Sequence, residues 1–256
     1  MTLQAVGFDF DDTIMERELA EVQAQAQEFV KIWGGNSTQI AKKVFAELRG
    51  RPPRMSDYFV AAGWPREKIT ESDYKKFEPI FLKVRVDLYL KFSKSRVTRG
   101  FVKFLKAIAK QKEKRKLKLF IVSGTSTELI ENALRQFGID SRVFDSIINS
   151  REKPKVVKGF LESHGIEPKN SLFVGDSQLD YQVSKELGTQ FLGLKPKRAG
   201  AVHEELRREG VRILNDFLNL DEKIRPLDKE LSTGIKEHIL KDRAARQKRF
   251  TRRWRK

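Results

Sequence analysis

The chain begins with a short apolar segment that ends in acidic residues: residues 6–14 are VGFDFDDTI. Apolar runs of this length are typical of buried strands, and turn residues normally end them, not three acids in four positions. Like charges at the end of a strand are unfavourable unless a cation lies among them. In an extended chain Asp9 and Asp11 point to the same side, because side chains alternate with a period of two. The segment therefore predicts a metal site directly after the first strand.

Composition sets limits on the class of protein. The 256 residues are 39% hydrophobic and 34% charged, which suits one large domain or two small ones. The net charge of +17 favours polyanionic partners, namely nucleic acid, acidic membranes or phosphorylated substrates, and a solvated lysine-rich surface is the alternative. The absence of cysteine excludes disulfides and thiolate catalysis. Without a signal-peptide pattern or a run of about 20 apolar residues, we expect a cytoplasmic protein with no transmembrane segment.

Two kinds of pattern divide the chain. Residues 15–97 carry apolar side chains at helical spacing and no convincing strand, which predicts a helical insertion. From Thr98 onward strands and helices alternate, and this rhythm predicts an α/β fold with a doubly wound parallel sheet. Thr125, with Glu128 three positions later, is expected to cap the helix after the second strand. The predicted strands cover residues 3–10, 117–122, 143–148, 172–174 and 191–194.

Polar clusters follow four of these predicted strands. They are Asp9 with Asp11 and Thr13, then Ser123, then Lys153, then Asp176 with Asp180. Right-handed crossovers bring the carboxyl ends of parallel strands to one edge of the sheet, where open α/β sheets bind ligands. Carboxylates alone would bind a cation, and the added hydroxyl and ammonium groups create a place for an anion beside it. The ligand that best fits this set is a phosphoryl group bridged to Mg²⁺, which prefers oxygen ligands.

These clusters also resemble, in order, the four motifs of the haloacid dehalogenase-like phosphohydrolases. Residues 9–13, DFDDT, match the D-x-D-x-T signature after the first strand of that family, and the resemblance covers residues 3–10 and 98–218. It implies a Rossmann-like catalytic core formed by residues 1–14 and 98–220. Residues 15–97 would be a helical cap inserted after the first motif, as in the phosphoglycolate phosphatase-like branch. Residues 221–256 would form a basic C-terminal extension.

The same resemblance implies roles for individual residues. Asp9 would be the nucleophile and Asp11 the general acid and base. An acid at position 11 favours phosphate chemistry over carbon–halogen chemistry. The residues expected to bind the substrate phosphate are Thr13, Ser123, Gly124 and Lys153. The expected Mg²⁺ ligands are Asp9, the backbone carbonyl of Asp11, Asp176 and Asp180. Asp12 is expected to face solvent or act as a cap, and metal ligation is its alternative role.

The function implied is that of a Mg²⁺-dependent phosphatase that hydrolyses a small phosphomonoester through an aspartyl phosphate. The alternatives are a phosphomutase, a nucleotide- or nucleic-acid-associated phosphatase, and a non-catalytic nucleic-acid-binding protein. The segment Lys241–Lys256 holds nine basic residues and one acid, with Phe250 and Trp254 among them. Such a segment is typical of one that binds nucleic acid or another polyanion, and a solvated helical extension is the alternative.

Overall fold

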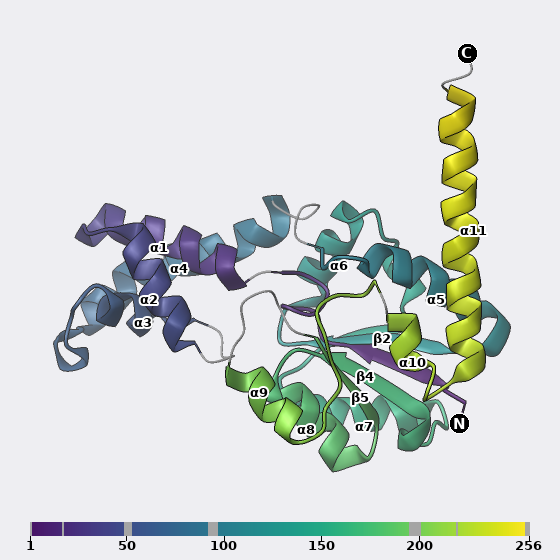
Figure 1. Ribbon diagram of the computed structural model, residues 1–256. Helices are drawn as coiled ribbons and strands as arrows, with labels where there is room; N and C mark the ends of the chain where they lie inside the picture. Colours follow the sequence, from purple (N-terminus) through teal and green to yellow (C-terminus); the bar gives the residue numbers. More distant parts are fainter. Residues whose placement is uncertain are drawn as a thin grey trace.

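The protein is described here by a computed structural model that covers residues 2–16, 18–48, 53–91, 97–194, 201–218 and 220–253. Its centre is a sheet of parallel strands in the order β3-β2-β1-β4-β5-β6 (Figure 1). The strands are β1 (Ala5–Phe8), β2 (Lys118–Ser123), β3 (Ser146–Asn149), β4 (Ser171–Gly175), β5 (Gln190–Leu194) and β6 (Ile213–Leu214). The five predicted strands are present within a few residues of their expected limits, and β6 was not predicted.

The central strand β1 is buried on both faces, as its uninterrupted apolar sequence requires. Val6 and Phe8 pack on one side of the sheet, and Ala5 packs on the other. A Cβ atom on Gly7 would lie 2.8 Å from Cδ2 of Phe173 and would overlap a second aromatic ring. Glycine at this position therefore lets aromatic side chains from the neighbouring strands close over β1.

Helices cover both faces of the sheet, which gives three layers (Figure 1). One face packs against α5 (Phe101–Arg115), α6 (Thr127–Gln136), α10 (Leu220–Ile224) and α11 (Lys229–Arg253). The other packs against α7 (Lys153–Ser163) and α8 (Gln178–Leu187). Helix α9 (Ala201–Arg208) lies between β5 and β6 in the chain. The predicted α/β fold with a doubly wound parallel sheet is confirmed.

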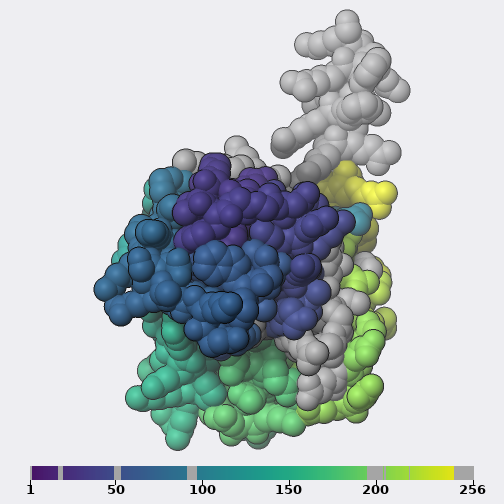
Figure 2. Space-filling view, turned by 90° about the vertical axis from the view of Figure 1, so that its left-hand side faces the viewer, coloured from purple at the N-terminus to yellow at the C-terminus, as the bar shows by residue number. Residues whose placement is uncertain are grey.

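The segment after β1 is a helical insert, as expected. It consists of α1 (Glu18–Trp33), α2 (Ser37–Glu47), α3 (Met55–Ala61), the short 3₁₀ helix η1 (Arg66–Lys68) and α4 (Glu71–Lys91). The insert has its own hydrophobic cluster, in which the rings of Phe29, Phe59 and Phe77 pack edge to face. The space-filling view shows the insert as one purple and blue lobe above the green part of the core (Figure 2). The exact limits of core, cap and extension stay predictions.

The two connections between insert and core run side by side. Met15 pairs with Val97 in an antiparallel bridge, and the Thr98 backbone N–H donates to the Ile14 carbonyl at 2.8 Å. The buried Thr98 hydroxyl donates to the Thr13 carbonyl at 2.7 Å. The insert therefore leaves and rejoins the core at one place, directly beside the acidic segment that follows β1.

The C-terminal region begins inside the core. Leu231 and Ile235 of α11 are fully buried in the main hydrophobic cluster, and Asp228 accepts a hydrogen bond from the Leu3 backbone N–H at 2.9 Å. Beyond this anchor the α11 backbone continues as a helix to Arg253 and projects from the molecule (Figure 1). Residues 254–256 of the predicted polyanion-binding segment lie outside the described residues. Among the described helices, none has the length and hydropathy needed to cross a bilayer.

Candidate active site

The site lies where the strand order of the sheet reverses. From β1 the chain continues to β2 and β3 on one side, and β4, β5 and β6 lie on the other side. Asp9 follows β1 and Asp176 follows β4, and the Asp9 backbone N–H donates to the Val174 carbonyl at 2.9 Å. Open α/β sheets bind ligands at the carboxyl ends of the strands around such a switch point. The topology therefore places these two aspartates where a ligand is expected.

Three carboxylates converge at this edge. Asp9, Asp176 and Asp180 each offer one oxygen, and these oxygens all lie within 4.8 Å of one another. Lys153, the first residue of α7, places its Nζ 2.7 Å from Oδ1 of Asp9 and 2.6 Å from Oδ1 of Asp180. Asp9 and Asp180 are buried and Asp176 is half-buried, so little solvent reaches the cluster to screen its charges.

Burial and mutual repulsion disfavour the charged forms of these carboxylates. Burial, together with the charges of Asp180 and Asp11, raises the pKa of Asp9 to about 7 against the opposing charge of Lys153. Burial, followed by the charge of Asp9, also raises the pKa of Asp176 well above its usual value. Burial acts to lower the pKa of Lys153, but Asp180 and Asp9 outweigh it and raise that pKa, so the side chain is an ammonium ion.

This donor set fits a divalent cation. A cation among Asp9, Asp176 and Asp180 would relieve the repulsion that their buried charges create, and carboxylate oxygens suit hard ions such as Mg²⁺. Each of the three carboxylates that the sequence predicts as metal ligands is therefore in a suitable place. Asp11 contributes through its backbone carbonyl in that prediction, which stays a prediction.

Asp180 also helps to cap the start of α8. Its Oδ2 accepts hydrogen bonds from the Asp176 and Ser177 backbone N–H groups at 3.2 and 3.0 Å and from the Ser177 hydroxyl at 2.6 Å. Ser177 Oγ accepts in turn from the Asp180 backbone N–H, which completes a capping box. Asp180 therefore fixes the loop that carries Asp176 and at the same time holds Lys153.

The turn after β1 brings Thr13 back toward β4. Asp12 has a φ of +56°, in the left-handed region that aspartate tolerates, and its backbone N–H donates to the Met15 carbonyl at 2.7 Å. Asp12 is half-buried, and its charge is one of the causes that raise the Asp176 pKa. The buried Thr13 hydroxyl donates to Oδ1 of Asp176 at 3.2 Å. Thr13 thus orients a carboxylate of the cluster, while its expected contact with phosphate stays a prediction.

Asp11 is held by hydroxyl groups. Its Oδ2 accepts from Thr125 Oγ1 at 2.8 Å and from Ser123 Oγ at 3.4 Å, and its Oδ1 accepts from the hydroxyl of Tyr89. The prediction that Thr125 caps the following helix is wrong: α6 begins at Thr127 with Ser126 as its first flanking residue, and Thr125 faces Asp11 instead. Helix-cap preferences describe only the local backbone and omit a carboxylate that folding brings from a distant segment.

Sequence reasoning missed two side chains that contact Asp11. Thr125 could have been found from the sequence, because it lies two positions after Ser123 and adds a hydroxyl group at the same strand end. Tyr89 belongs to α4 of the insert, and nothing in its neighbouring sequence sets it apart from an ordinary core aromatic residue. Gly124 follows Ser123 as expected, and a Cβ there would lie 3.6 Å from Arg151 Cγ, so packing alone does not require glycine.

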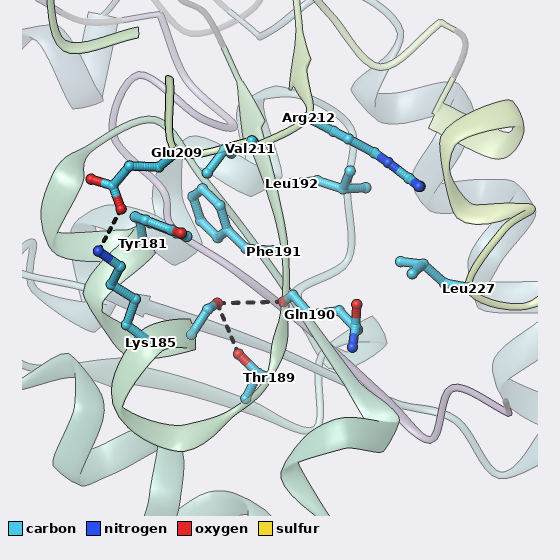
Figure 3. A pocket seen from close by; sticks show the side chains of 12 residues that line it. Tyr181, Lys185, Thr189, Gln190, Phe191, Leu192, Glu209, Val211, Arg212 and Leu227 are labelled. Atoms are coloured by element: carbon cyan, nitrogen blue, oxygen red, sulfur yellow. Dashed lines mark hydrogen bonds and ion pairs between the residues drawn. The ribbon is translucent and has the colours of Figure 1, made fainter. Parts of the chain in front are cut away.

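A separate hollow of about 350 Å³ lies beside β5 (Figure 3). Its walls include Tyr181, Gln190 and Arg212, and Figure 3 shows the Lys185 ammonium directed at the Glu209 carboxylate. None of the clustered aspartates lines it. This hollow is therefore distinct from the candidate active site.

The order of the motifs along the chain and their convergence at one sheet edge agree with a match to a known protein family. Residues 6–194 match the model of the haloacid dehalogenase-like hydrolases. The chain belongs to this family. The acidic triad of Asp9, Asp176 and Asp180 is typical of the metal site of haloacid dehalogenase-like hydrolases. No curated protein matches the chain.

Solved structures share the fold at low sequence identity. A Clostridium difficile protein whose name proposes a phosphatase is 18% identical, with 88% of this chain and 99% of that chain covered and a TM-score of 0.67. A protein from Haemophilus somnus 129PT, named as a predicted phosphoglycolate phosphatase, is 20% identical, with 86% and 97% covered and a TM-score of 0.62. CbbY from Rhodobacter sphaeroides, solved in complex with phosphate, is 16% identical, with 86% and 96% covered and a TM-score of 0.56. These likenesses show a common fold.

Proposed function

We propose that this hydrolase is a Mg²⁺-dependent phosphatase that acts on a small phosphomonoester through an aspartyl phosphate on Asp9. The observation that carries the proposal is the Lys153 ammonium, 2.7 Å from Asp9 Oδ1 within a cluster of carboxylates. A carboxylate that attacks a phosphate dianion meets strong charge repulsion, and an ammonium ion beside the attacking group lowers it. The phosphatase names and the phosphate complex among the related folds agree with such a substrate.

The residues divide the reaction between them. A carboxylate oxygen of Asp9 attacks phosphorus, and the bond from phosphorus to the ester oxygen breaks as the aspartyl phosphate forms. Asp11 gives its proton to the leaving oxygen and then takes a proton from the water that attacks the aspartyl phosphate. This second step releases inorganic phosphate and restores Asp9. Lys153 and Ser123 are proposed to bind the transferring phosphoryl group.

Asp9, Asp176 and Asp180 would hold the ion, with Thr13 and the capping box of α8 fixing their orientation. Bound there, Mg²⁺ would supply positive charge against the phosphoryl oxygens. The helical insert, by its place after the first motif, is proposed to act as a cap that limits access to small substrates. We also propose that the protein acts in the cytoplasm.

The test is phosphate release from a panel of small phosphomonoesters, with Mg²⁺ and with EDTA. We expect metal-dependent release that the Asp9→Asn variant loses, because an amide cannot serve as the nucleophile. Asp140→Asn is the matched control, since Asp140 is exposed and pairs with Arg142 away from the cluster. Turnover that appears only with an added bisphosphate would instead identify a phosphomutase. Equal rates in Asp9→Asn and the unaltered protein would refute the proposed nucleophile.

A further inference from the structure

Tyr89 belongs to the insert by sequence and to the core by packing. It lies in the last turns of α4, yet its side chain is fully buried in the main hydrophobic cluster and not in the cluster of the insert. Its ring stacks on Phe10, with centroids 6.4 Å apart and an interplanar angle of 23°. Phe10 separates Asp9 from Asp11 in the chain, so this stacking sets Tyr89 directly against the acidic segment.

The hydroxyl of Tyr89 completes a set of donors around Asp11. It donates to Oδ1, while the Thr125 hydroxyl donates to Oδ2 at 2.8 Å, and the two hydroxyl oxygens lie 3.0 Å apart. A carboxylate with a donor on each oxygen has a fixed side-chain orientation, because rotation would break both hydrogen bonds. Asp11 thus accepts hydrogen bonds from two segments that are distant in sequence.

The backbone around Tyr89 is fastened to the core as well. Gln136 of α6 donates through Nε2 to the carbonyls of Tyr89 and Leu90, at 3.2 and 2.7 Å. Asn132 Nδ2, one turn earlier on α6, lies 3.4 Å from the Tyr89 carbonyl. These amides satisfy carbonyls near the end of α4 and hold that end against a core helix. The position of the Tyr89 hydroxyl is therefore set by the core.

We propose that Tyr89 is a positioning residue for Asp11. Its hydroxyl holds the Asp11 carboxyl group in the orientation from which its proton passes to the leaving oxygen of the substrate. The inference rests on the proposed role of Asp11 as general acid, and it adds a residue from the insert to the groups that serve that step.

The role predicts a dependence on the leaving group. An alkyl phosphate releases a strongly basic alkoxide and needs the proton, whereas p-nitrophenyl phosphate releases a stable phenolate without one. The ratio kcat/KM reports steps up to departure of the leaving group, so later hydrolysis of the aspartyl phosphate does not enter. For Tyr89→Phe we expect kcat/KM to fall about tenfold for an alkyl phosphate and to change less than about twofold for p-nitrophenyl phosphate.

Tyr58→Phe is the matched control. Tyr58 is also a fully buried tyrosine of the insert, but its hydroxyl donates to Gln25 Oε1 at 2.6 Å. Its loss should lower thermal stability about as much as Tyr89→Phe does and should leave the ratio between the two substrates unchanged. Thr125→Val, which removes the shorter of the two hydroxyl hydrogen bonds to the other oxygen of Asp11, should change that ratio in the same direction as Tyr89→Phe.

The results of these assays distinguish failure of the Tyr89 positioning role from failure of the proposed phosphatase function. An equal loss on both substrates in Tyr89→Phe, or no loss on either, would overturn the positioning role while the proposed phosphatase stands. If the unaltered protein releases phosphate from neither substrate nor from any member of the panel, the proposed function is wrong and the role of Tyr89 falls with it. A loss confined to the alkyl phosphate, absent from Tyr58→Phe, would establish the role.

Discussion

A Cβ atom on Gly175 would lie 2.7 Å from Oδ2 of Asp180, which is closer than Cβ atoms approach other heavy atoms in folded proteins. Gly175 ends β4, and Asp180 lies in the first turn of the helix that follows. The carboxylate that caps α8 and holds Lys153 therefore occupies the space that any other residue at position 175 would fill.

Gly175→Ala should consequently displace Asp180. We expect a loss of about 1–3 kcal/mol in the free energy of unfolding, as for other overpacked sites, together with weaker Mg²⁺ binding. Urea denaturation and calorimetric titration would measure the two effects. Gly159→Ala in α7 is the control, because beyond its chain neighbours and its own helix backbone no described atom lies within 4 Å of the added Cβ, and alanine favours a helix. Equal stabilities of the two variants would contradict this account of Gly175.

Lys153→Met should leave two buried carboxylates without their ammonium partner. Removal of one member of a buried ion pair typically costs about 3–5 kcal/mol, so we expect a large loss of stability in EDTA and a smaller one in Mg²⁺. Phosphate release should fall as well, because Asp9 loses the charge beside it. Lys155→Met, two positions along and exposed, should change stability by less than about 0.5 kcal/mol. Similar melting temperatures for both variants in EDTA would exclude the proposed electrostatic role.

Mg²⁺ binding should weaken as the pH falls. Burial, and the charges of Asp180 and Asp11 against that of Lys153, raise the pKa of Asp9 to about 7 in the metal-free protein. The carboxylate must lose that proton before it can bind a cation, so affinity should decrease between about pH 8 and pH 6. Calorimetry in two buffers of different ionisation enthalpy would count the protons released, and Asp9→Asn should release fewer. A pH-independent affinity would contradict the prediction.

Asp145, in the fold outside the site, has a pKa that is shifted in the opposite direction to that of Asp9. Burial opposes its charge, but the Leu119 backbone N–H at 2.8 Å and two lysines, Lys112 and Lys118, outweigh it and lower its pKa. A carboxyl group whose pKa is lower in the folded state stabilises the fold above its unfolded pKa, and that stability is lost as the pH falls through the folded pKa.

Asp145→Asn should therefore reduce the free energy of unfolding by about 1 kcal/mol near neutral pH, with the difference shrinking below about pH 4. Asparagine still offers an oxygen to the Leu119 N–H, so the change removes charge and little else. Urea denaturation at several pH values would measure it. A constant difference between variant and unaltered protein at all pH values would show that the charge plays no part.

Removal of residues 241–256 should weaken binding to nucleic acid or other polyanions, if the basic segment has the role expected from its charge. We expect a salt-sensitive shift of single-stranded RNA in a gel by the full chain, and at least about tenfold weaker binding after truncation. The cut leaves Leu231 and Ile235 in the core, so the melting temperature serves as the control for folding. Unchanged binding by the truncated protein would refute the role of this segment.

Local sequence patterns predicted the parts of this protein whose determinants are local. The sheet was predicted from apolar runs, such as the one before Asp9, and from the turn residues after them. Most of the acidic cluster was predicted from the positions of its residues directly after those strands. Strand β6 was not predicted, because its two residues, Ile213 and Leu214, are too few to show an alternating pattern.

The hydrogen bonds to the Asp11 side chain were not predicted, for a different reason. Tyr89 and Thr125 reach it from separate elements, and only the folded arrangement of α4 against α6 brings both hydroxyls to one carboxylate. A tyrosine at a helical core position satisfies the same apolar spacing whether its hydroxyl meets water, a carbonyl or a carboxylate. The sequence therefore constrains where such a ring packs and leaves the partner of its hydroxyl undetermined.

The position of β1 in the sheet also governs the order in which the chain acquires structure. Ala5 pairs with Lys118 on one side and with Ser171 on the other, so β1 has no strand neighbour until β2 has been synthesised, and its second neighbour β4 follows later still. The contacts within α1–α4, by contrast, join residues close in sequence, which favours early folding. We expect the insert to gain structure while β1, with its exposed apolar residues, is still unpaired. We therefore expect chaperones that recognise apolar segments to bind β1 during synthesis.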